Sequence, residues 1–514
     1  MAARPGIGED GGAEPLRSRS RTGGRGLTAG GVRPAAVRAR GWGWRYAGRR
    51  LPAVRDVDVD IAPGERVLLL GASGAGKSTL LAGMAGLLGT EEDGHAAGAM
   101  LVDGDDPAAH RGRVGLVLQD PDAGVVLSRV GDDVAFGCEN LGVDPVEIPS
   151  RVGEALSAVG LDVRLERETA RLSGGQKQRL AIAGVLAMRP GLLLLDEPTA
   201  NLDPAGVSEV RRAVGDAVRS SGATLVVIEH RTDVWIDLMT RVIVLDAGGG
   251  LLADGAPEEV FARHADALLA AGVWLPGKPI ELPALPPTPP GSVDALRACD
   301  LSISRDGRTA VQEGLELEVA AGAASILTGP NGAGKSTLAL TLAGLLPEHT
   351  GTVEAVSLPA GRRGMRPSRW SSRELLTRIG TVFQDPEHQF LTQTVRDELA
   401  VGPRALKMTD AATSRIVDDL LERLGLTALA RANPFTLSGG QKRRLSVATV
   451  LATAPRVIVL DEPTFGQDRR GWAGIIGLLQ EQIGEGRAVV AVTHDDDVVR
   501  LLGGRRYALT GGPA

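Results

Sequence analysis

The chain has 514 residues, of which 43% are hydrophobic and 23% charged, and this length is too great for a single hydrophobic core. A formal net charge of −6 argues against a general nucleic-acid binder, which carries a basic surface. Two cysteines, Cys138 and Cys299, are too few for a disulfide framework and lack metal-ligand spacing, so we expect a reducing compartment.

The N-terminal segment is rich in arginine and glycine, and no apolar stretch follows that could act as a signal peptide. We expect residues 1–36 to form a disordered arm. A solvated tail is the favoured interpretation of its arginines, and contact with anionic lipid is the alternative. No run of about 18 apolar residues occurs in the chain, so no membrane-spanning helix is predicted.

Within the first half of the chain, apolar runs alternate with helix-like stretches, which indicates an α/β fold. The runs Val67–Leu70, Leu192–Leu195 and Thr224–Ile228 lack two-residue alternation, as expected for parallel strands covered by helices on both faces. The helices that we expect beside these strands cover Leu80–Leu88, Gln176–Ala187 and Val207–Val218.

A proline-rich segment follows this half. The sequence WLPGKPIELPALPPTPPGS at 274–292 contains seven prolines in 19 residues. Because proline lacks an amide donor and fixes φ, we expect residues 273–293 to form an extended, semi-rigid spacer that belongs to neither core. At about 3 Å per residue, the spacer could span on the order of 50 Å and allow the halves to lie in opposite orientations.

The motifs of the first half return in the same order after the spacer, which identifies one domain duplicated within the chain. GASGAGKST at 71–79 returns as GPNGAGKST at 329–337, LSGGQKQR at 172–179 as LSGGQKRR at 437–444, and LLLLDEPT at 192–199 as VIVLDEPT at 457–464. We expect the first domain over residues 37–272 and the second over residues 294–514.

The pattern G-x-x-x-x-G-K-[ST] is typical of a phosphate-binding loop between a strand and a helix. Its lysine neutralises phosphate charge and its serine binds Mg²⁺. The predicted nucleotide-binding residues of the two loops are Gly71, Ala72, Ser73, Gly74, Ala75, Gly76, Lys77, Ser78 and Thr79, and Gly329, Pro330, Asn331, Gly332, Ala333, Gly334, Lys335, Ser336 and Thr337. ATP with Mg²⁺ is therefore the expected ligand.

Two neighbouring acids end an apolar run in each half. Asp196 and Asp461 lie at the carboxyl end of a predicted strand, where a carboxylate can hold Mg²⁺ through water. Glu197 and Glu462 follow them, and a carboxylate there can orient or deprotonate the attacking water.

A histidine and a glutamine complete the pattern in each half. His230 and His494 end the next apolar run and are predicted to contact the γ-phosphate and the attacking water. Gln119 and Gln384 are predicted to reach Mg²⁺ and water from a mobile loop. With the two glutamates, these four residues are the expected catalytic groups.

Taken together, these motifs resemble those of the ATP-binding cassette family of transporter ATPases, from about residue 37 to the end of the chain. The resemblance implies two tandem P-loop NTPase domains of the α/β class. Each would contain a RecA-like, mostly parallel sheet, an antiparallel β subdomain and an α-helical subdomain. It also implies that the chain hydrolyses ATP.

The resemblance further implies that each LSGGQ signature completes the ATP site of the other half. Ser438, Gly439, Gly440 and Gln441 would cap the γ-phosphate of ATP on the first phosphate loop. We call this composite site one. Ser173, Gly174, Gly175 and Gln176 would do the same on the second phosphate loop, and we call this composite site two.

The two halves depart from each other at two places. Tyr46 is placed like the aromatic residue that stacks on adenine in this family, whereas the second half offers Arg305. After the Asp-Glu-Pro-Thr sequence, the first half reads ANLDPAG and the second FGQDRR. Neither change removes a proposed catalytic group, so we predict two working sites with unequal affinity.

The Gln-loop region resembles that of the energy-coupling-factor ATPases, which import vitamins and cobalt or nickel ions. The second half keeps the pattern of those proteins in Asp385, Pro386, Glu387 and Gln389, whereas Gly124 replaces the second glutamine in the first half. The alternatives are another class of importer, whose second half is often degraded, and a soluble tandem ATPase acting on the ribosome, whose halves are usually separated by a long charged helix.

The resemblance to importers implies a peripheral position at the cytoplasmic face of the cell membrane. Its partners would be an integral membrane scaffold subunit and a membrane subunit that binds the substrate. The acids that could receive arginines from such a partner are Asp132, Asp133, Glu139, Asp397 and Glu398, and ordinary surface acids are the alternative.

Overall fold

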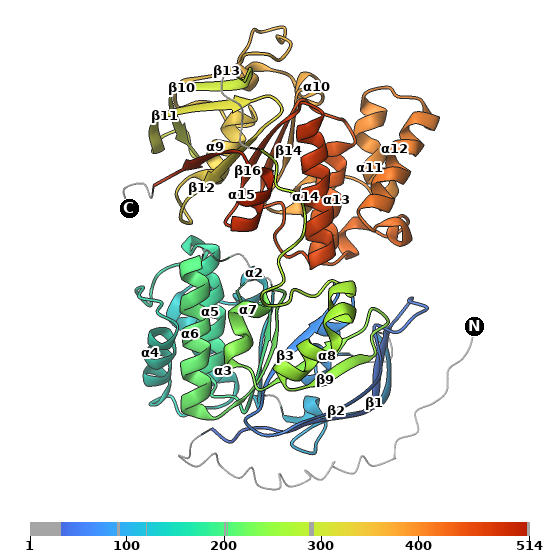
Figure 1. Ribbon diagram of the computed structural model, residues 1–514. Helices are drawn as coiled ribbons and strands as arrows, with labels where there is room; N and C mark the ends of the chain where they lie inside the picture. Colours follow the sequence, from blue (N-terminus) through green and yellow to red (C-terminus); the bar gives the residue numbers. More distant parts are fainter. Residues whose placement is uncertain are drawn as a thin grey trace, which may run out of the picture.

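The computed structural model describes residues 32–89, 93–110, 112–119, 121–199, 202, 204–286 and 292–510. Two similar α/β domains are stacked on one another, with the first half of the chain below and the second above in Figure 1. The expected arm over residues 1–36 lies almost wholly outside the described residues. The described helices are too short or too polar for any of them to cross a membrane.

A mainly parallel sheet forms the centre of the first domain. Its order is β5 (Val114–Val117), β6 (Leu192–Asp196), β7 (Thr224–Ile228), β3 (Arg66–Gly71), β8 (Arg241–Leu245) and β9 (Leu251–Gly255). Only β9 runs antiparallel to its neighbour. The three strands predicted from apolar runs are therefore confirmed, and β6 and β7 are buried along their whole length.

The central sheet of the second domain has five strands, which all run parallel. Its order is β14 (Ile379–Val382), β15 (Val457–Asp461), β16 (Ala488–Val492), β12 (Ala324–Thr328) and β17 (Arg505–Ala508). The carboxyl ends of β12 and β15 lead into the second phosphate loop and the second Asp-Glu pair. This edge of the sheet corresponds to the edge formed by β3 and β6 in the first domain.

An antiparallel three-stranded sheet covers one face of each central sheet. In the first domain it has the order β2 (Val54–Ile61), β1 (Val37–Tyr46) and β4 (Gly94–Val102), and in the second β11 (Ala310–Ala320), β10 (Asp294–Ser304) and β13 (Thr350–Ala355). In the first domain, Trp42 and Trp44 of this sheet join a buried cluster with Leu192 and Leu194 of β6. This sheet and the central sheet therefore share one hydrophobic core.

The helices that begin at Lys77 and Lys335 pack on the same face of the central sheet as the antiparallel strands. Most of the other helices cover the opposite face, and some of them form a helical subdomain (Figure 1). Each domain has its own set of helices. In the first domain they are α1 (Lys77–Met84), α2 (Pro121–Gly124), α3 (Val130–Asn140), α4 (Ile148–Ala158), α5 (Gly174–Ala187), α6 (Pro204–Ser221), α7 (Thr232–Trp235) and α8 (Pro257–Ala270). In the second they are α9 (Lys335–Leu342), α10 (Ser372–Leu375), α11 (Val395–Ala405), α12 (Asp410–Arg423), α13 (Gly439–Leu451), α14 (Arg469–Gly484) and α15 (Asp496–Leu502). The predicted fold class is confirmed.

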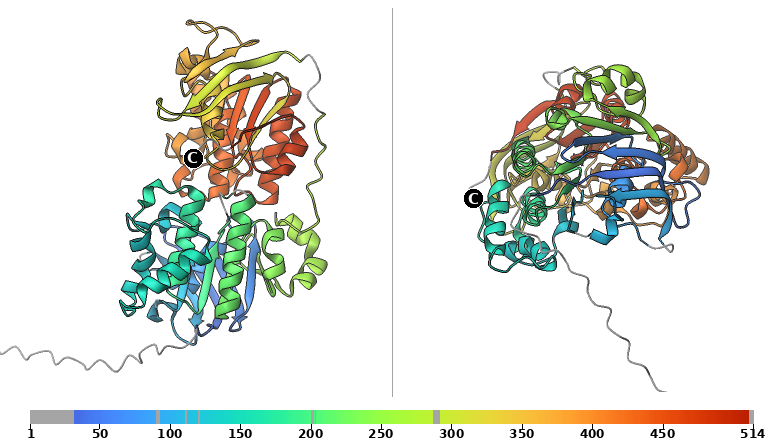
Figure 2. Two further views of the ribbon diagram at one scale, coloured as in Figure 1. Left: turned by 90° about the vertical axis from the view of Figure 1, so that its left-hand side faces the viewer. Right: turned by 90° about the horizontal axis from the view of Figure 1, so that it is seen from below.

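The linker between the domains is extended, but the prediction that it belongs to neither core is wrong for its described part. Val273 and Leu275 are buried in the core of the first domain, and Ile280 in that of the second. The backbone N–H of Leu285 donates to the carbonyl of Leu501 at 2.9 Å. Apolar residues between the prolines therefore hold the segment against both domains. The segment runs along the side of the molecule in Figure 2.

Candidate active site

The two phosphate loops have the same backbone conformation. Gly76 and Gly334, which precede α1 and α9, have φ values of 88° and 87°. A Cβ atom on Gly76 would lie 2.2 Å from the carbonyl oxygen of Ala53, so only glycine fits at this position. Each loop therefore leads directly into a helix whose positive end can face an anion.

The lysine of each loop is folded back over the loop backbone. Lys77 Nζ donates to the carbonyl oxygens of Gly71 at 2.8 Å and Ala72 at 3.1 Å. Lys335 Nζ makes the equivalent bonds to Gly329 and Pro330, at 2.8 and 2.9 Å. Burial lowers the pKa of Lys77, and this unfavourable burial of the ammonium group would be offset by phosphate oxygens.

Each loop serine meets the aspartate at the end of the neighbouring strand. The side chain of Ser78 is hydrogen-bonded to Asp196, and that of Ser336 to Asp461. Burial raises the pKa of Asp196 to about 6, which a bound cation would reverse. One hydroxyl and one carboxylate fit Mg²⁺, which takes few protein ligands beside the phosphates of its nucleotide. The described residues contain no cluster of three or more metal-binding side chains.

The glutamate after each aspartate has a strained backbone. Glu197 and Glu462 have φ values of 48° and 49°, which non-glycine residues rarely adopt. Their N–H groups donate to the carbonyls of Ile228 and Val492, each at 3.0 Å. The strand pairing thus holds each glutamate at the carboxyl edge of the sheet, next to the histidine that follows the adjacent strand.

In site one, the side chain of Glu197 is enclosed by two predicted catalytic residues. Gln119 Nε2 donates to Glu197 Oε2 at 2.7 Å, and His230 Nε2 lies 3.0 Å from Glu197 Oε1. Although burial acts to raise the pKa of Glu197, the charge and hydrogen bond of His230 and the hydrogen bond from Gln119 hold it below its ordinary value. The structure therefore brings all three residues together.

In site two, the corresponding glutamate is held less closely. His494 Nε2 lies 3.7 Å from Glu462 Oε1. Burial raises the pKa of Glu462 to about 7, with the neighbouring Asp461 adding to the effect. A carboxylate with a pKa near the working pH is well suited to accept a proton from water.

Both signature sequences start a helix with a capping box. The N–H of Gln176 donates to Ser173 Oγ at 3.3 Å, and the N–H of Ser173 donates to Gln176 Oε1 at 3.1 Å. Ser438 and Gln441 make the same pair of bonds, at 3.4 and 3.0 Å. The serine and the first glycine of each signature therefore form the exposed N-terminal tips of α5 and α13, whereas Gly440 is buried.

In site one, the second signature lies against the first phosphate loop. A Cβ atom on Gly74 would be 3.7 Å from Gln441 Nε2, and one on Gly439 would be 3.6 Å from Gln119 Nε2. The N–H of Ser73 donates to Asp468 Oδ2 at 3.3 Å. Residues from both halves thus meet where ATP is expected.

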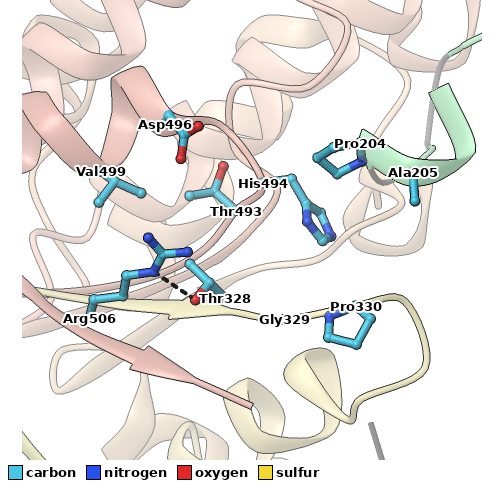
Figure 3. Close-up of a pocket in the computed structure, with 10 residues that line it drawn as sticks. All are labelled: Pro204, Ala205, Thr328, Gly329, Pro330, Thr493, His494, Asp496, Val499 and Arg506. Atoms are coloured by element: carbon cyan, nitrogen blue, oxygen red, sulfur yellow. Dashed lines mark hydrogen bonds between the residues drawn. The ribbon is translucent and has the colours of Figure 1, made fainter. Parts of the chain in front are cut away.

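Site two is more open. A cavity of about 410 Å³ separates Pro330 and His494 from Pro204 and Ala205 of the first half, as Figure 3 shows. Among the described residues, no atom outside its own helix and chain neighbours lies within 4 Å of the position of a Cβ on Gly174. The start of α6 therefore faces the second phosphate loop across this cavity, and the described residues that line the cavity include none of the first signature.

The predicted adenine contacts also differ between the halves. The hydroxyl group of Tyr46 lies 3.1 Å from Thr79 Oγ1, beside the first phosphate loop. The guanidinium carbon of Arg49 lies 5.6 Å from the centre of the tyrosine ring. Arg305, at the corresponding place in the second half, is exposed. The described structure of the second half therefore offers no aromatic ring where Tyr46 lies in the first.

Two of the acids proposed to bind a partner have a structural role. Asp133 Oδ1 accepts from the N–H groups of Val126 and Leu127, each at 2.7 Å. Glu398 Oε2 accepts from the N–H groups of residues 391 and 392, at 2.9 and 2.7 Å. Because both carboxylates are buried, the hypothesis that they receive arginines from a partner is wrong. In both halves, a carboxylate stands at the same position of the helix that follows the Gln loop. This shared position is the sequence signal that could have indicated a structural role.

The other three acids lie closer to the surface. Asp132 and Glu139 are exposed. Asp397 accepts hydrogen bonds from Thr394 Oγ1 at 2.7 Å and from Arg404 at 3.2 Å. Contact of these acids with a partner stays a prediction.

The single difference between the signature octamers was not recognised as functional from the sequence. Arg443, where the first half has Gln178, donates to the carbonyls of Phe383 at 2.6 Å and of Gln384. Gln389 donates to the carbonyl of Ser446 at 2.9 Å. The second Gln loop is therefore tied to its own signature helix through groups that the first half lacks.

The comparisons with known proteins agree with this geometry. The family model described as ABC transporter matches residues 54–200 and 312–465. One relative is the provisionally named HMP/thiamine import ATP-binding protein YkoD of Bacillus subtilis (strain 168). It is 37% identical to this chain over 87% of this chain and 85% of its own length. The ABC transporter ATP-binding protein SCO2324 of Streptomyces coelicolor (strain ATCC BAA-471 / A3(2) / M145), provisional in the same way, is 34% identical over 91% of both chains.

A solved structure also shares the tandem arrangement. The RNase-L inhibitor aligns with a TM-score of 0.59 over 91% of this chain and 87% of its own, at 20% identity. This likeness concerns the fold alone.

Proposed function

The chain belongs to the ABC transporter family and is a tandem ATP-binding protein with ATPase activity, and on this premise we propose that it powers a membrane importer. The proposed importer is of the energy-coupling-factor type and takes up a vitamin or cobalt or nickel ions. The name of the Bacillus relative, which refers to HMP/thiamine import, supports a vitamin. The intact catalytic residues in both halves support an importer in which both sites hydrolyse ATP.

We infer that each ATP is bound between the halves. In site one, Lys77 would neutralise phosphate charge, and Ser78 and Asp196 would hold Mg²⁺, which supplies positive charge to the phosphates. Glu197, oriented by His230, would accept the proton of the attacking water. The Ser438 hydroxyl and the amides behind it would cap the γ-phosphate.

In site two, the second half would supply the phosphate loop and the catalytic residues, and the first half would supply the signature. Lys335, Ser336 and Asp461 would bind the nucleotide and Mg²⁺, and Glu462 with His494 would act on the water. Ser173 would reach the γ-phosphate only after the cavity of site two closes. ATP binding would therefore draw the halves together, and hydrolysis would release them.

The observation that carries the composite sites is the contact of the second signature with the first phosphate loop. If site one is shared, Ser438→Arg should silence the same ATP as Lys77→Ala, and the double variant should lose no more than either single one. Phosphate release from the purified chain measures this. Additive losses would contradict a shared site.

A surface at each Gln loop supports docking of a membrane scaffold subunit. The turns that Asp133 and Glu398 hold present Val126 and Leu391, whose exposed fractions are 59% and 76%. Two exposed aliphatic side chains on rigid turns are suited to an apolar contact with a partner. A membrane subunit that binds the substrate would complete the importer without touching this chain's ATP sites.

The partner class can be tested by affinity purification of the chain from detergent-solubilised membranes, followed by mass spectrometry. We expect hydrophobic subunits to co-purify, and Val126→Asp with Leu391→Asp to release them while basal ATP hydrolysis is retained. Glu258→Lys, a change at an exposed acid of α8 that is not among the proposed partner contacts, is the matched surface control. Recovery of ribosomal proteins instead would favour a translation factor.

A further inference from the structure

The tryptophan at the start of the linker connects segments of both halves. Its carbonyl oxygen accepts a hydrogen bond from Thr232 Oγ1 at 2.8 Å, two residues beyond His230. Trp274 Nε1 donates to the carbonyl of Gln467 at 3.2 Å. The ring also packs edge-on against Trp472, with a centroid distance of 5.8 Å. Trp274 is thus in contact with the histidine end of site one and with the segment after the second Asp-Glu-Pro-Thr.

Gln467 extends this connection to the second signature. Its side chain is buried, and its Nε2 donates to the carbonyl of Gly440 at 3.0 Å. The residue in the same place after the first Asp-Glu-Pro-Thr is Leu202, which has no amide. The bond between this segment and a signature therefore exists on the site-one side and cannot form through Leu202 on the other.

The neighbours of Gln467 fasten the same segment to the linker and to the first phosphate loop. The N–H of Arg469 donates to the carbonyl of Gly272 at 2.8 Å, and its guanidinium donates to the carbonyl of Pro279 at 2.7 Å. Asp468 accepts from the N–H of Ser73 at 3.3 Å. The segment thus lies between the linker and the phosphate loop of site one.

We propose that Trp274 and Gln467 are positioning residues that hold the second signature over the first phosphate loop, so that the linker keeps site one assembled. This proposal rests on the proposed function, because it takes the signature to bind the γ-phosphate. A tether at this point raises the local concentration of one signature at one site. Loss of either hydrogen bond should weaken nucleotide binding at site one and leave site two unchanged.

The test uses the full chain with one site disabled at a time. In a Lys335→Ala background, Trp274→Phe and Gln467→Leu should each raise the Kd of Mg²⁺ with AMPPNP, a non-hydrolysed ATP analogue, about fivefold. In a Lys77→Ala background, the same changes should leave the Kd within about twofold. Titration calorimetry measures the Kd in both backgrounds. A variant that failed to fold would lose binding in both backgrounds, so it could not imitate a change at site one alone.

The changes were chosen to preserve packing. Phenylalanine keeps an aromatic ring against Trp472, and leucine is the residue of the first half. Trp370→Phe is the matched control, because Trp370 is buried and its Nε1 donates to the carbonyl of Gly364 at 2.8 Å, away from the linker. This variant should leave both Kd values unchanged.

Three results would overturn the proposal: no rise in Kd in the Lys335→Ala background, equal rises in both backgrounds, or an equal rise with Trp370→Phe. Failure of the proposed function gives a different result. In that case Lys77→Ala and Lys335→Ala alone would leave the number of AMPPNP molecules bound per chain unchanged.

Discussion

Site one and site two are built from the same motifs, yet they differ in how far they are assembled. In site one the distance between His230 and Glu197 is 3.0 Å and a signature lies against the loop, whereas in site two the distance between His494 and Glu462 is 3.7 Å and a cavity remains. The motifs themselves are nearly identical. Under the proposal above, the difference comes from residues between the motifs, namely Gln467 in place of Leu202 and the linker on one side of the molecule.

The largest expected effect concerns the two glutamates. The double variant Glu197→Gln with Glu462→Gln should lower kcat for ATP hydrolysis about 10²- to 10³-fold, because an amide cannot accept the proton of the attacking water. Each single variant should retain measurable turnover, by unequal amounts, if both sites work. Phosphate release with Asp132→Asn as the surface control measures this. A silent Glu462→Gln would show that only site one turns over.

Chemical crosslinking tests the difference in assembly directly. Without nucleotide, cysteines in the variant Gln119→Cys with Gly439→Cys should react with a short thiol crosslinker about tenfold faster than those in Gln384→Cys with Gly174→Cys, because only the first pair is held together. Both variants carry Cys299→Ser, since Cys299 is exposed. Fragment size after proteolysis between the halves reports the link. Equal rates would mean that the two sites are assembled alike.

The next smaller effect concerns the free energy of unfolding that the buried acids beside the two Gln loops contribute. Removing the carboxylate in Asp133→Ala or Glu398→Ala leaves two partly buried backbone N–H groups without their acceptor and should lower the free energy of unfolding by about 2 kcal/mol. The loss should be larger for Glu398, which also accepts from Thr392 Oγ1 at 3.0 Å. Urea unfolding with Asp132→Ala as control measures both. An unchanged midpoint in either variant would contradict a structural role.

The smallest expected effect concerns an ion pair between the halves. Arg231 lies 2.8 Å from Asp495, but the arginine side chain is 57% exposed, and exposed pairs contribute about 0.5 kcal/mol or less. Arg231→Gln should therefore change the Kd for AMPPNP at either site by less than about twofold. A tenfold change at site two would mean that this pair, and not the linker, sets the difference between the sites.

Much of the fold could be predicted from local sequence. The strand pattern of Leu192–Asp196 and Thr224–Ile228 is purely apolar, and the helix after each signature begins at its capping serine. The helix expected over Leu80–Leu88 ends earlier, at Met84, and Gly86 beyond it adopts φ 66°. Local patterns therefore identify elements better than they identify their ends.

The remaining features depend on contacts that local sequence does not carry. Asp133 and Glu398 look like surface acids, because their burial depends on turns seven residues earlier. The prolines of the linker predict an extended spacer, and nothing in the local sequence indicates that Ile280 and Leu285 pack on the second domain. The hydrogen bond to which we attribute the unequal assembly of the two sites joins residues 274 and 467, which are far apart in the chain.

The path of the linker gives the chain a direction that two separate identical subunits could not have. Such a pair must treat its two nucleotides alike at rest, because rotation exchanges them. A single polypeptide that leaves one domain beside His230 and reaches its twin beside Gln467 removes that equivalence. Joining the halves in the reverse order would conserve every motif and yet place the linker beside the opposite nucleotide.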